Sequence, residues 1–286
     1  MSVAELGSFS AAARRHFVTQ PAVSLRIRAL EEAVGSVLID RAGARLTAAG
    51  LLFRDRCREA LRAVDQGLAE VAELNGLERG RLQIGAIDAA AVYLLPPLLR
   101  KFHALHPRVE IVIRVEPSAS LVEAVIDGRL DSAVVALPAG RRELQVLQLE
   151  VETLVLMAPP GAGRTPRRVL ERLPLIAYPR GSVTRSLIDA ALADRKLTPR
   201  TSMELAHPEA ILRMVEAGLG AAVLPERIAG RGSQRLVTLP SFRVRRGLGL
   251  VSRKAETPSP AARAFQKLAE ERLARPAPRP SRPAAG

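Results

Sequence analysis

The sequence predicts an α/β protein with an amino-terminal winged helix-turn-helix, a long connecting helix and a larger two-lobed α/β region. Two short helices and a hairpin are expected within residues 1–47, and a proline-free amphipathic stretch follows over 48–79. Strand patterns then alternate with helix patterns over 80–275. At 286 residues the chain is long enough for a small domain and a larger one.

Composition narrows the classes of function. The net charge of +14 would suit a nucleic-acid partner, although residues 1–79 are nearly neutral. Aromatic residues make up only 3% of the chain, so stacking on single-stranded nucleic acid is not expected. The single cysteine, Cys57, excludes an intramolecular disulfide and a zinc site of several thiolates. We expect a cytoplasmic protein with no membrane partner, because we find no signal peptide and no apolar run of about eighteen residues.

Two helices are predicted at residues 9–16 and 20–34. Ser8 is placed to cap the first helix, and Thr19 is a candidate cap for the second. Gly35 is a suitable end for the second helix, because glycine adopts the left-handed conformation that often follows a last turn.

The second helix has two contrasting sides. One side is apolar, at Val23, Ile27, Leu30 and Val34. The other side carries small, hydroxyl, apolar and cationic residues: Pro21, Ser24, Leu25 and Arg28. Such a helix suits the major groove of DNA, where Arg28 could meet guanine or phosphate. Gln20 and Ser24 could form hydrogen bonds with base edges or phosphate.

A hairpin is predicted after this helix. Residues 37–39 and 45–47 have the pattern of its strands, and 40–44 that of its turn. Arg41 and Arg45 flank its tip, which indicates a wing that contacts the DNA backbone or the minor groove.

Residues 48–75 are predicted to form one long helix with an apolar seam. The seam has near-heptad spacing and consists of Cys57, Leu61, Val64, Leu68, Val71 and Leu74. We expect dimerisation through Leu61, Val64, Leu68 and Val71, since the outer positions are charged throughout. The alternative is an amphipathic helix packed on its own domain. A dimer would present two recognition helices to a palindromic site.

The remaining chain is predicted to form two similar lobes with parallel sheets covered on both faces. In the first lobe we expect strands at 81–87, 109–115 and 132–137, and helices at 92–106 and 120–127. In the second we expect strands at 175–178, 202–205 and 221–224, and helices at 183–192 and 208–217. Segments 150–158 and 248–253 would cross between lobe I (80–157 and 247–275) and lobe II (158–246). The Pro-rich tail, 276–286, is expected to be disordered.

A ligand cleft is predicted between the lobes, because open sheets of this kind bind ligands beyond the carboxyl ends of their strands. Several loops there begin helices, whose free amides favour a small anionic effector. The candidate effector-binding residues are Asp88, Ala89, Ser118, Leu137, Pro138, Ser182, Thr184, Arg185, His207 and Glu209. For any single loop hydroxyl, helix capping alone is an equally good explanation.

The motifs in these regions resemble those of LysR-type transcriptional regulators. Residues 7–50, GSFSAAARRHFVTQPAVSLRIRALEEAVGSVLIDRAGARLTAAG, resemble the family's DNA-binding signature. RGRLQIGA, YLLPPLLRKFHALHPRVE, LVEAVIDGRLDSAVV, ILRMVEAGLGAAVLP and SPAARAFQKL resemble its effector domain, which is itself similar to periplasmic substrate-binding proteins. The family's DNA contacts carry over to Ser8, Gln20, Pro21, Ser24, Arg28, Arg41 and Arg45.

The resemblance implies a dimeric or tetrameric regulator that binds double-stranded promoter DNA at an imperfect palindrome and responds to a small effector. We expect effector binding to close the cleft, to change how the dimers pack and to alter the bend of bound DNA. RNA polymerase is left open as a further partner.

Three departures from the family pattern lead to separate expectations. Leu25 replaces a residue that is usually basic, and Arg26 is the candidate to compensate for it. The family has a helix of about ten residues before the GSF motif, and we expect this chain to lack it and to bind DNA less well. Ala89 stands near a common Ser or Thr position, so one hydroxyl contact to the ligand is missing.

Other functions are less well supported by the sequence. His103 and His106 have no third metal ligand nearby, Gly218 and Gly220 lack dinucleotide-binding spacing, and Ser182 has no evident histidine–acid partners. We therefore expect no enzyme, metal or cofactor. A solute-binding protein would need a signal peptide and would not carry the recognition helix. A second alternative is a regulator that dimerises and binds effector but binds DNA poorly.

Overall fold

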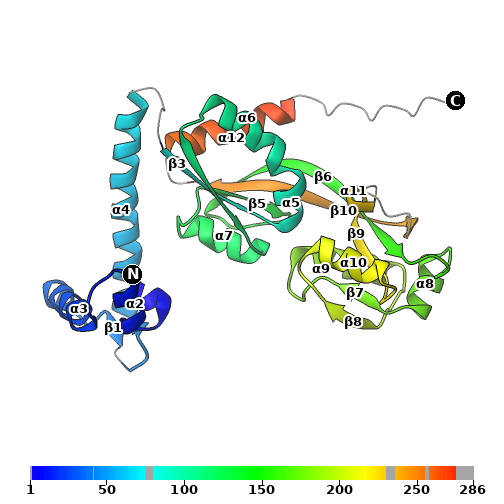
Figure 1. Cartoon of the computed structure of the whole chain (residues 1–286), viewed down its shortest axis with the longest axis horizontal. Coiled ribbons are helices and arrows are strands. Elements are labelled where there is room, and N and C mark those ends of the chain that lie inside the picture. Colours follow the sequence, from blue (N-terminus) through cyan, green and yellow to red (C-terminus); the bar gives the residue numbers. More distant parts are fainter. Residues whose placement is uncertain (1, 41, 75–79, 230–235, 255–257, 275–286) are drawn as a thin grey trace. The chain divides into compact units, whose positions relative to one another are not determined.

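The computed structural model describes residues 2–40, 42–74, 80–229, 236–254 and 258–274 (Figure 1). The chain divides into two compact units, Met1–Leu68 and Ala69–Gly286, which are described in turn. The predicted domain limits at residues 47, 79 and 275 remain predictions, and the predicted disordered tail lies outside the described residues. None of the described helices is both long and apolar enough to cross a membrane.

The first unit is a winged helix-turn-helix. The elements up to the end of the long helix are α1 (Ser2–Leu6), α2 (Phe9–Arg15), α3 (Gln20–Val34), β1 (Ile39–Asp40), β2 (Arg45–Leu46) and α4 (Ala48–Leu74). Ser8 caps α2 as predicted, its hydroxyl accepting a hydrogen bond from Ala11 N at 3.2 Å. Thr19 occupies the cap position of α3 without a side-chain bond, and Gly35 ends α3 with φ of 71°.

A helix does precede the GSF motif, but it is shorter than the helix of about ten residues that was expected to be missing. Five residues form α1, and its Val3 is buried in a cluster with Ala12, Leu38 and Ile39. Ser2 Oγ also lies 2.6 Å from Nε2 of His16, beyond the end of α2. This turn therefore supplies one apolar side chain, Val3, to the cluster behind α2.

The wing is joined closely to the start of α4. Its two strands pair antiparallel, and Thr47, which follows them, donates its hydroxyl hydrogen to Val37 O at 2.7 Å. The same Thr47 oxygen accepts from Gly50 N at 3.0 Å. A Cβ on Gly50 would stand 2.0 Å from Leu38 O, so this close approach of α4 to the wing requires glycine.

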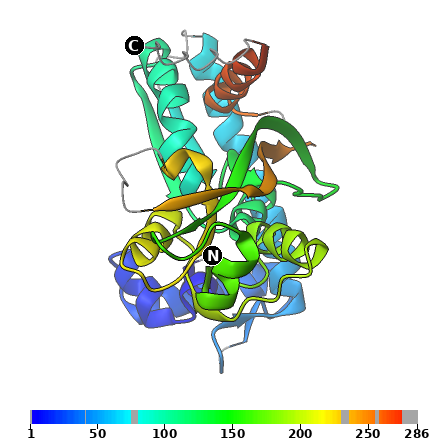
Figure 2. The same cartoon turned by 90° about the vertical axis from the view of Figure 1, so that its right-hand side faces the viewer.

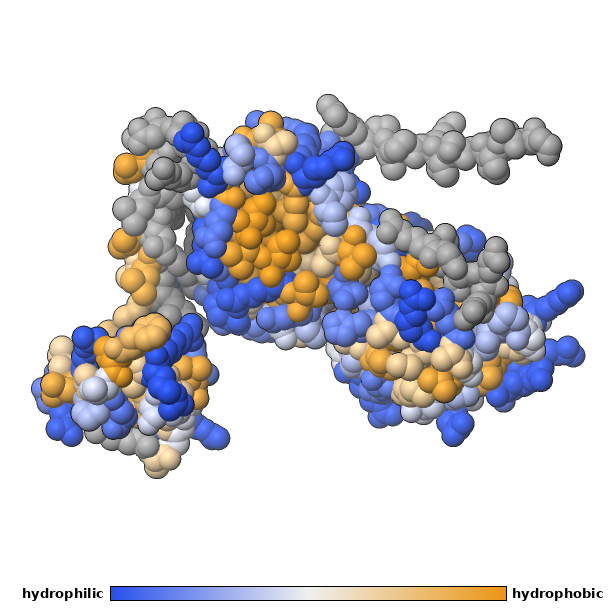
Figure 3. All heavy atoms as spheres, in the orientation of Figure 1, coloured by the Kyte–Doolittle hydropathy of each residue, from blue (hydrophilic) through white to orange (hydrophobic). Residues whose placement is uncertain are grey.

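The apolar seam of α4 is largely exposed within this chain. Leu61, Val64 and Val71 are 57–61% exposed, and Figure 3 shows apolar side chains along the shaft of the helix. The side chain of Leu68 lies outside the described part of the structure. Dimerisation through the seam stays a prediction, and the exposure of these side chains leaves them available for it.

The second unit contains a mixed sheet, in which the predicted strands of lobe I lie parallel and antiparallel pairing enters through the two crossover segments, whose direction was not predicted. Among the described residues its strands are β3 (Gly80–Ala86), β4 (Val109–Val115), β5 (Ser132–Ala136), β6 (Leu144–Ala158), β9 (Ala222–Pro225) and β10 (Val237–Arg253). They lie in the order β4-β3-β5-β10-β6-β9, of which β4, β3 and β5 are parallel and the others pair antiparallel. The cause is the antiparallel pairing of β6 and β10, the long strands that run through both lobes (Figure 1 and Figure 2).

Two parallel strands, β7 (Leu175–Ala177) and β8 (Thr201–Glu204), complete lobe II. A bridge between Leu175 and Ala221 connects them to the chain entering β9. The two predicted crossovers are confirmed in position, but β6 and β10 are both longer than predicted.

Helices cover the sheets of both lobes. Lobe I has α5 (Asp88–Tyr93), α6 (Leu95–Leu105), α7 (Ser118–Ile126) and α12 (Pro260–Ala274), and lobe II has α8 (Pro166–Arg172), α9 (Val183–Asp194), α10 (Pro208–Glu216) and α11 (Glu226–Ala229). The single helix predicted at 92–106 is two helices, because Pro96 and Pro97 lack amide hydrogens and fit only the first turn of a new helix. Helices α8, α11 and α12 were not predicted.

We predict that Gly50→Ala destabilises the protein by about 1–3 kcal/mol, because the added methyl group would overlap the Leu38 carbonyl. Urea unfolding followed by circular dichroism would measure the change. Gly67→Ala is the matched control on the same helix, since no atom lies within 4 Å of its added Cβ. It should be neutral or stabilising, because alanine is the better helix former. Equal effects of the two changes would contradict the assigned packing.

Candidate DNA interface and ligand cleft

The predicted recognition helix, α3, presents a polar surface to solvent. Gln20, Pro21, Arg26 and Arg28 are exposed, and Ser24 is half-buried beside them. Gln20 Nε2 donates to Ser24 Oγ at 3.3 Å, so these two side chains lie together on adjacent turns. Leu25 is 68% exposed and makes this face partly apolar.

The other predicted DNA contacts, Ser8, Arg41 and Arg45, come from outside α3. Arg45 is exposed on β2, directly opposite Asp40, and Arg41 lies outside the described residues. Ser8 is half-buried, and its oxygen is already used to cap α2. Its hydroxyl hydrogen could still be donated to a phosphate, so a DNA contact at Ser8 remains a prediction.

A buried carboxylate that sequence reasoning missed joins α3 to the wing. Glu31 is 9% exposed, and its Oε1 accepts from Leu38 N at 2.8 Å and from Ile39 N at 3.0 Å. Charge-assisted bonds of this kind are stronger than neutral ones. Glu31 therefore fixes the angle between recognition helix and wing. Its position in the LE-x-x-x-G motif was the only signal in the sequence.

A cleft of about 650 Å³ lies between the lobes of the second unit. Seven predicted effector-binding residues line it: Asp88, Ala89, Ser118, Pro138, Ser182, Thr184 and His207. Two of them already cap or connect elements, since Ser182 Oγ accepts from Arg185 N and Ser118 Oγ accepts from Ala136 N, each at 3.2 Å. The volume falls within the range of ordinary small-molecule sites.

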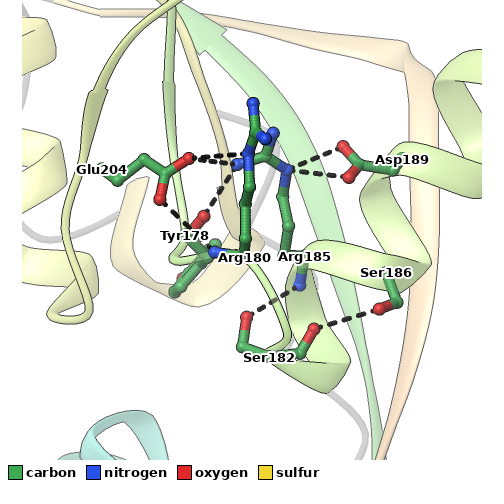
Figure 4. Close-up of polar contacts among 7 residues, drawn as sticks. All are labelled: Tyr178, Arg180, Ser182, Arg185, Ser186, Asp189 and Glu204. Carbon is green, nitrogen blue, oxygen red and sulfur yellow. Dashed lines mark hydrogen bonds and ion pairs between the residues drawn. The ribbon is translucent and has the colours of Figure 1, made fainter.

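Three other predicted residues do not line the cleft, because each packs elsewhere. Arg185 is 8% exposed, and its guanidinium binds Asp189 at 2.8 Å, Tyr178 O at 2.9 Å and Glu204 at 3.3 Å (Figure 4). Glu209 accepts a hydrogen bond from Tyr93 Oη. Leu137 packs closely against the backbone of Gly247 and Gly249.

Arg246, which the sequence did not single out, forms part of the cleft floor. It is 2% exposed on β10 and lies directly opposite Glu152 of β6 in the strand register. Its Nε donates to Glu152 Oε1 at 2.9 Å, and its Nη1 donates to Thr184 Oγ1 at 2.8 Å. Glu152 therefore neutralises the guanidinium, and Thr184 at the start of α9 is held against the crossover strands.

Tyr178, also missed, supplies a buried hydroxyl to the cleft wall. It follows β7, is 6% exposed and lies near Arg246. Burial raises the pKa of its phenol to about 12, with the charges of Glu152 and Asp88 adding to the effect and that of Arg246 opposing it. Among the described residues its hydroxyl has no hydrogen-bond partner of standard geometry. Because its pKa is raised, the Tyr178 phenol is protonated at neutral pH and can donate a hydrogen bond.

Polar contacts also cross between the lobes beside the cleft. His207 Nδ1, at the start of α10, lies 2.8 Å from Asp88 Oδ2 of α5. Tyr93 of α5 bonds Glu209 of α10, and the Arg227 guanidinium of α11 lies 5.9 Å from the centre of the Tyr93 ring. Burial lowers the pKa of Arg227, and nearby Arg246 lowers it further. Groups from both lobes thus meet at the edge of the cleft.

A winged helix-turn-helix and a two-lobed unit with a cleft define a class of protein: a DNA-binding regulator with a ligand-sensing domain. Comparison of the sequence with known protein families supports this class. Residues 1–51 match the bacterial regulatory helix-turn-helix protein family of lysR type, and residues 75–274 match the LysR substrate binding domain. The chain belongs to the LysR family of transcriptional regulators.

Individual relatives extend over almost the whole chain. The RuBisCO operon transcriptional regulator of Allochromatium vinosum is 30% identical over 292 residues, covering 96% of this chain and 94% of that protein. YbhD of Escherichia coli K12, an uncharacterized HTH-type transcriptional regulator, is 28% identical over 276 residues. The match covers 93% of this chain and 87% of that protein.

Solved structures share the fold. Full-length CbnR, crystallised with its target DNA, superposes with a TM-score of 0.67 at 24% identity, covering 95% of this chain and 96% of that one. A Corynebacterium glutamicum OxyR C206 mutant superposes with a TM-score of 0.58 at 25% identity. The match covers 96% of this chain and 91% of that one.

We predict that Glu31→Ala destabilises the protein by about 1–3 kcal/mol, because two buried backbone amides lose their acceptor. Chemical unfolding would measure the loss. Glu32→Ala is the matched control, since the Glu32 side chain is exposed on the next position of α3. If both variants unfold at the same denaturant concentration, the anchoring role of Glu31 is excluded.

We also predict that Arg246→Ala costs about 3–5 kcal/mol of stability, because it leaves the carboxylate of Glu152 buried without its main partner. Arg245→Ala, at the exposed neighbouring position on the same strand, should have little effect. Thermal unfolding of both variants compares them directly. A smaller loss in Arg246→Ala than in Arg245→Ala would disprove the structural role of the pair.

Proposed function

We propose that this chain is an effector-responsive transcriptional regulator that acts in the cytoplasm as a dimer or tetramer. In this proposal α3 and the wing bind an imperfect palindrome in promoter DNA, and the interlobe cleft binds a small anionic effector. The observation that carries it is the combination, in one chain, of an exposed polar recognition helix anchored to a wing and a cleft lined by helix starts.

The proposed DNA contacts divide by chemistry. Arg28 can donate two hydrogen bonds to the O6 and N7 atoms of a guanine, and Gln20 and Ser24 can bond base edges. Arg26 and Arg45 are exposed, and their guanidinium groups suit phosphates. Support for major-groove docking comes from the family match over residues 1–51 and from CbnR, a protein of the same fold that was crystallised with its target DNA.

The proposal that the effector carries a negative charge rests on the lobe II wall. Ser182 and His207 stand at the starts of α9 and α10, where first-turn amides have no intrahelical partner. Arg180 adds a positive charge on the same wall. An anion bound there would contact lobe II while its remainder reaches lobe I.

Effector binding would act through the contacts between the lobes. The Asp88–His207 and Tyr93–Glu209 pairs link lobe I to lobe II directly beside the cleft. A ligand that binds one interlobe angle more tightly than another shifts the population toward that angle. The size of the shift is set by the difference between the two affinities. In a dimer joined through the α4 seam, such a shift would change how two recognition helices meet the DNA.

We predict that Arg28→Ala weakens binding to the DNA upstream of the protein's own gene about tenfold and relaxes preference at one base position. Fluorescence anisotropy at several salt concentrations would measure affinity and the salt slope. Arg167→Ala, an exposed arginine on α8, serves as the control and should leave both unchanged. Wild-type affinity in the Arg28 variant would rule out the proposed recognition face.

A further inference from the structure

Charged side chains are segregated between the two walls of the cleft. Among the described lining residues, the lobe I wall carries three carboxylates, from Asp88, Glu116 and Glu123, and one guanidinium, from Arg141. The lobe II wall carries two guanidiniums, from Arg180 and Arg246, and no carboxylate among the described lining residues. A ligand that spans the cleft therefore meets opposite charges at its two ends.

Among the described lining residues, pairing leaves one carboxylate free. Arg141 binds Glu123, and Asp88 lies 2.8 Å from His207, so these groups are satisfied by the protein. Glu116, half-buried at the end of β4, has no hydrogen bond or ion pair with any described residue. Only its backbone amide is engaged, donating to Ala86 O at 3.3 Å. The Glu116 carboxylate is available for a positive group on the ligand.

Hydrogen-bond donors lie on the opposite wall. Tyr178 lines the cleft, and its buried hydroxyl, which lies near Arg246, has no hydrogen-bond partner of standard geometry among the described residues. The first-turn amides of α9, a helix of twelve residues, point along the helix axis from the same wall. Among the described residues Arg180 pairs with Glu204, at 3.5 Å, and its side chain is 84% exposed. Arg246, in contrast, is already neutralised by Glu152.

We propose that the effector is a zwitterion of the amino-acid class, with a carboxylate bound at Tyr178 and the start of α9 and an ammonium group bound at Glu116. Apolar lining residues, Ile87, Val122 and Val183, would contact the body of the ligand. A ligand with a carboxylate alone would leave Glu116 desolvated without a partner, which selects against simple anions. This inference rests on the proposed effector cleft and specifies the chemistry of its ligand.

The inference can be tested by calorimetric titration of the full chain with the L-amino acids. Each amino acid that binds is compared with the carboxylic acid that lacks its amine and with the amine that lacks its carboxylate. We expect at least one amino acid to bind, and removal of either charge to weaken binding at least tenfold. Binding of the deaminated acid as tightly as its amino acid overturns the inference, as does failure of every amino acid to bind at millimolar concentration.

Two conservative variants locate the charges. Glu116→Gln should weaken binding of the amino acid tenfold or more and leave binding of the deaminated acid unchanged. Tyr178→Phe should weaken binding of both ligands. Glu110→Gln, an exposed carboxylate on the same strand, is the control and should bind as the wild type does. Unchanged amino-acid affinity in Glu116→Gln overturns the inference. DNA binding and its loss in Arg28→Ala are measured separately, so failure here is distinguishable from failure of the proposed function.

Discussion

The antiparallel pairing of β6 and β10 is the constraint on which the second unit depends. These strands run through both lobes, and Arg246 of one lies opposite Glu152 of the other in the register. Both side chains are about 2% exposed, so neither charge could remain there without its partner. The bond from Arg246 to Thr184 then attaches the start of α9 to the same point. The crossover, the floor of the cleft and one helix start are therefore fixed together.

The cleft follows from this arrangement. Because two continuous strands connect the lobes, the loops after β3 and β4 of lobe I and after β7 and β8 of lobe II face one another across a single cavity. The side-chain contacts between lobes, Asp88 with His207 and Tyr93 with Glu209, lie at its edge and are partly exposed. Polar, partly exposed contacts can exchange partners more readily than a packed apolar core, which suits a cleft that closes on a ligand.

The amino-terminal unit shows how much could be predicted from local pattern and where that approach failed. Ser8, Gly35 and the period of Val23 and Ile27 predicted α2 and α3 closely, since caps and helical periodicity are local properties. Helix α1 was missed, because one turn contributes only a single buried residue, Val3. In the cleft, loop positions were predictable from strand ends. Arg185 was assigned to the cleft and Arg246 was not singled out, since the sequence does not reveal which side chains each arginine packs against.

The sequence by itself determined the order of elements, the recognition helix with its exposed face, the long helix with an apolar seam and the family. These depend on periodicity, capping residues and contiguous motifs, all of which act within a few turns of chain. Only the tertiary structure decided that Glu31 anchors the wing, that the sheet is mixed, and that Tyr178 and Glu116 line one cavity without partners in the described structure. The physical reason is that burial and pairing of polar groups depend on residues far apart in the chain, such as Glu152 and Arg246.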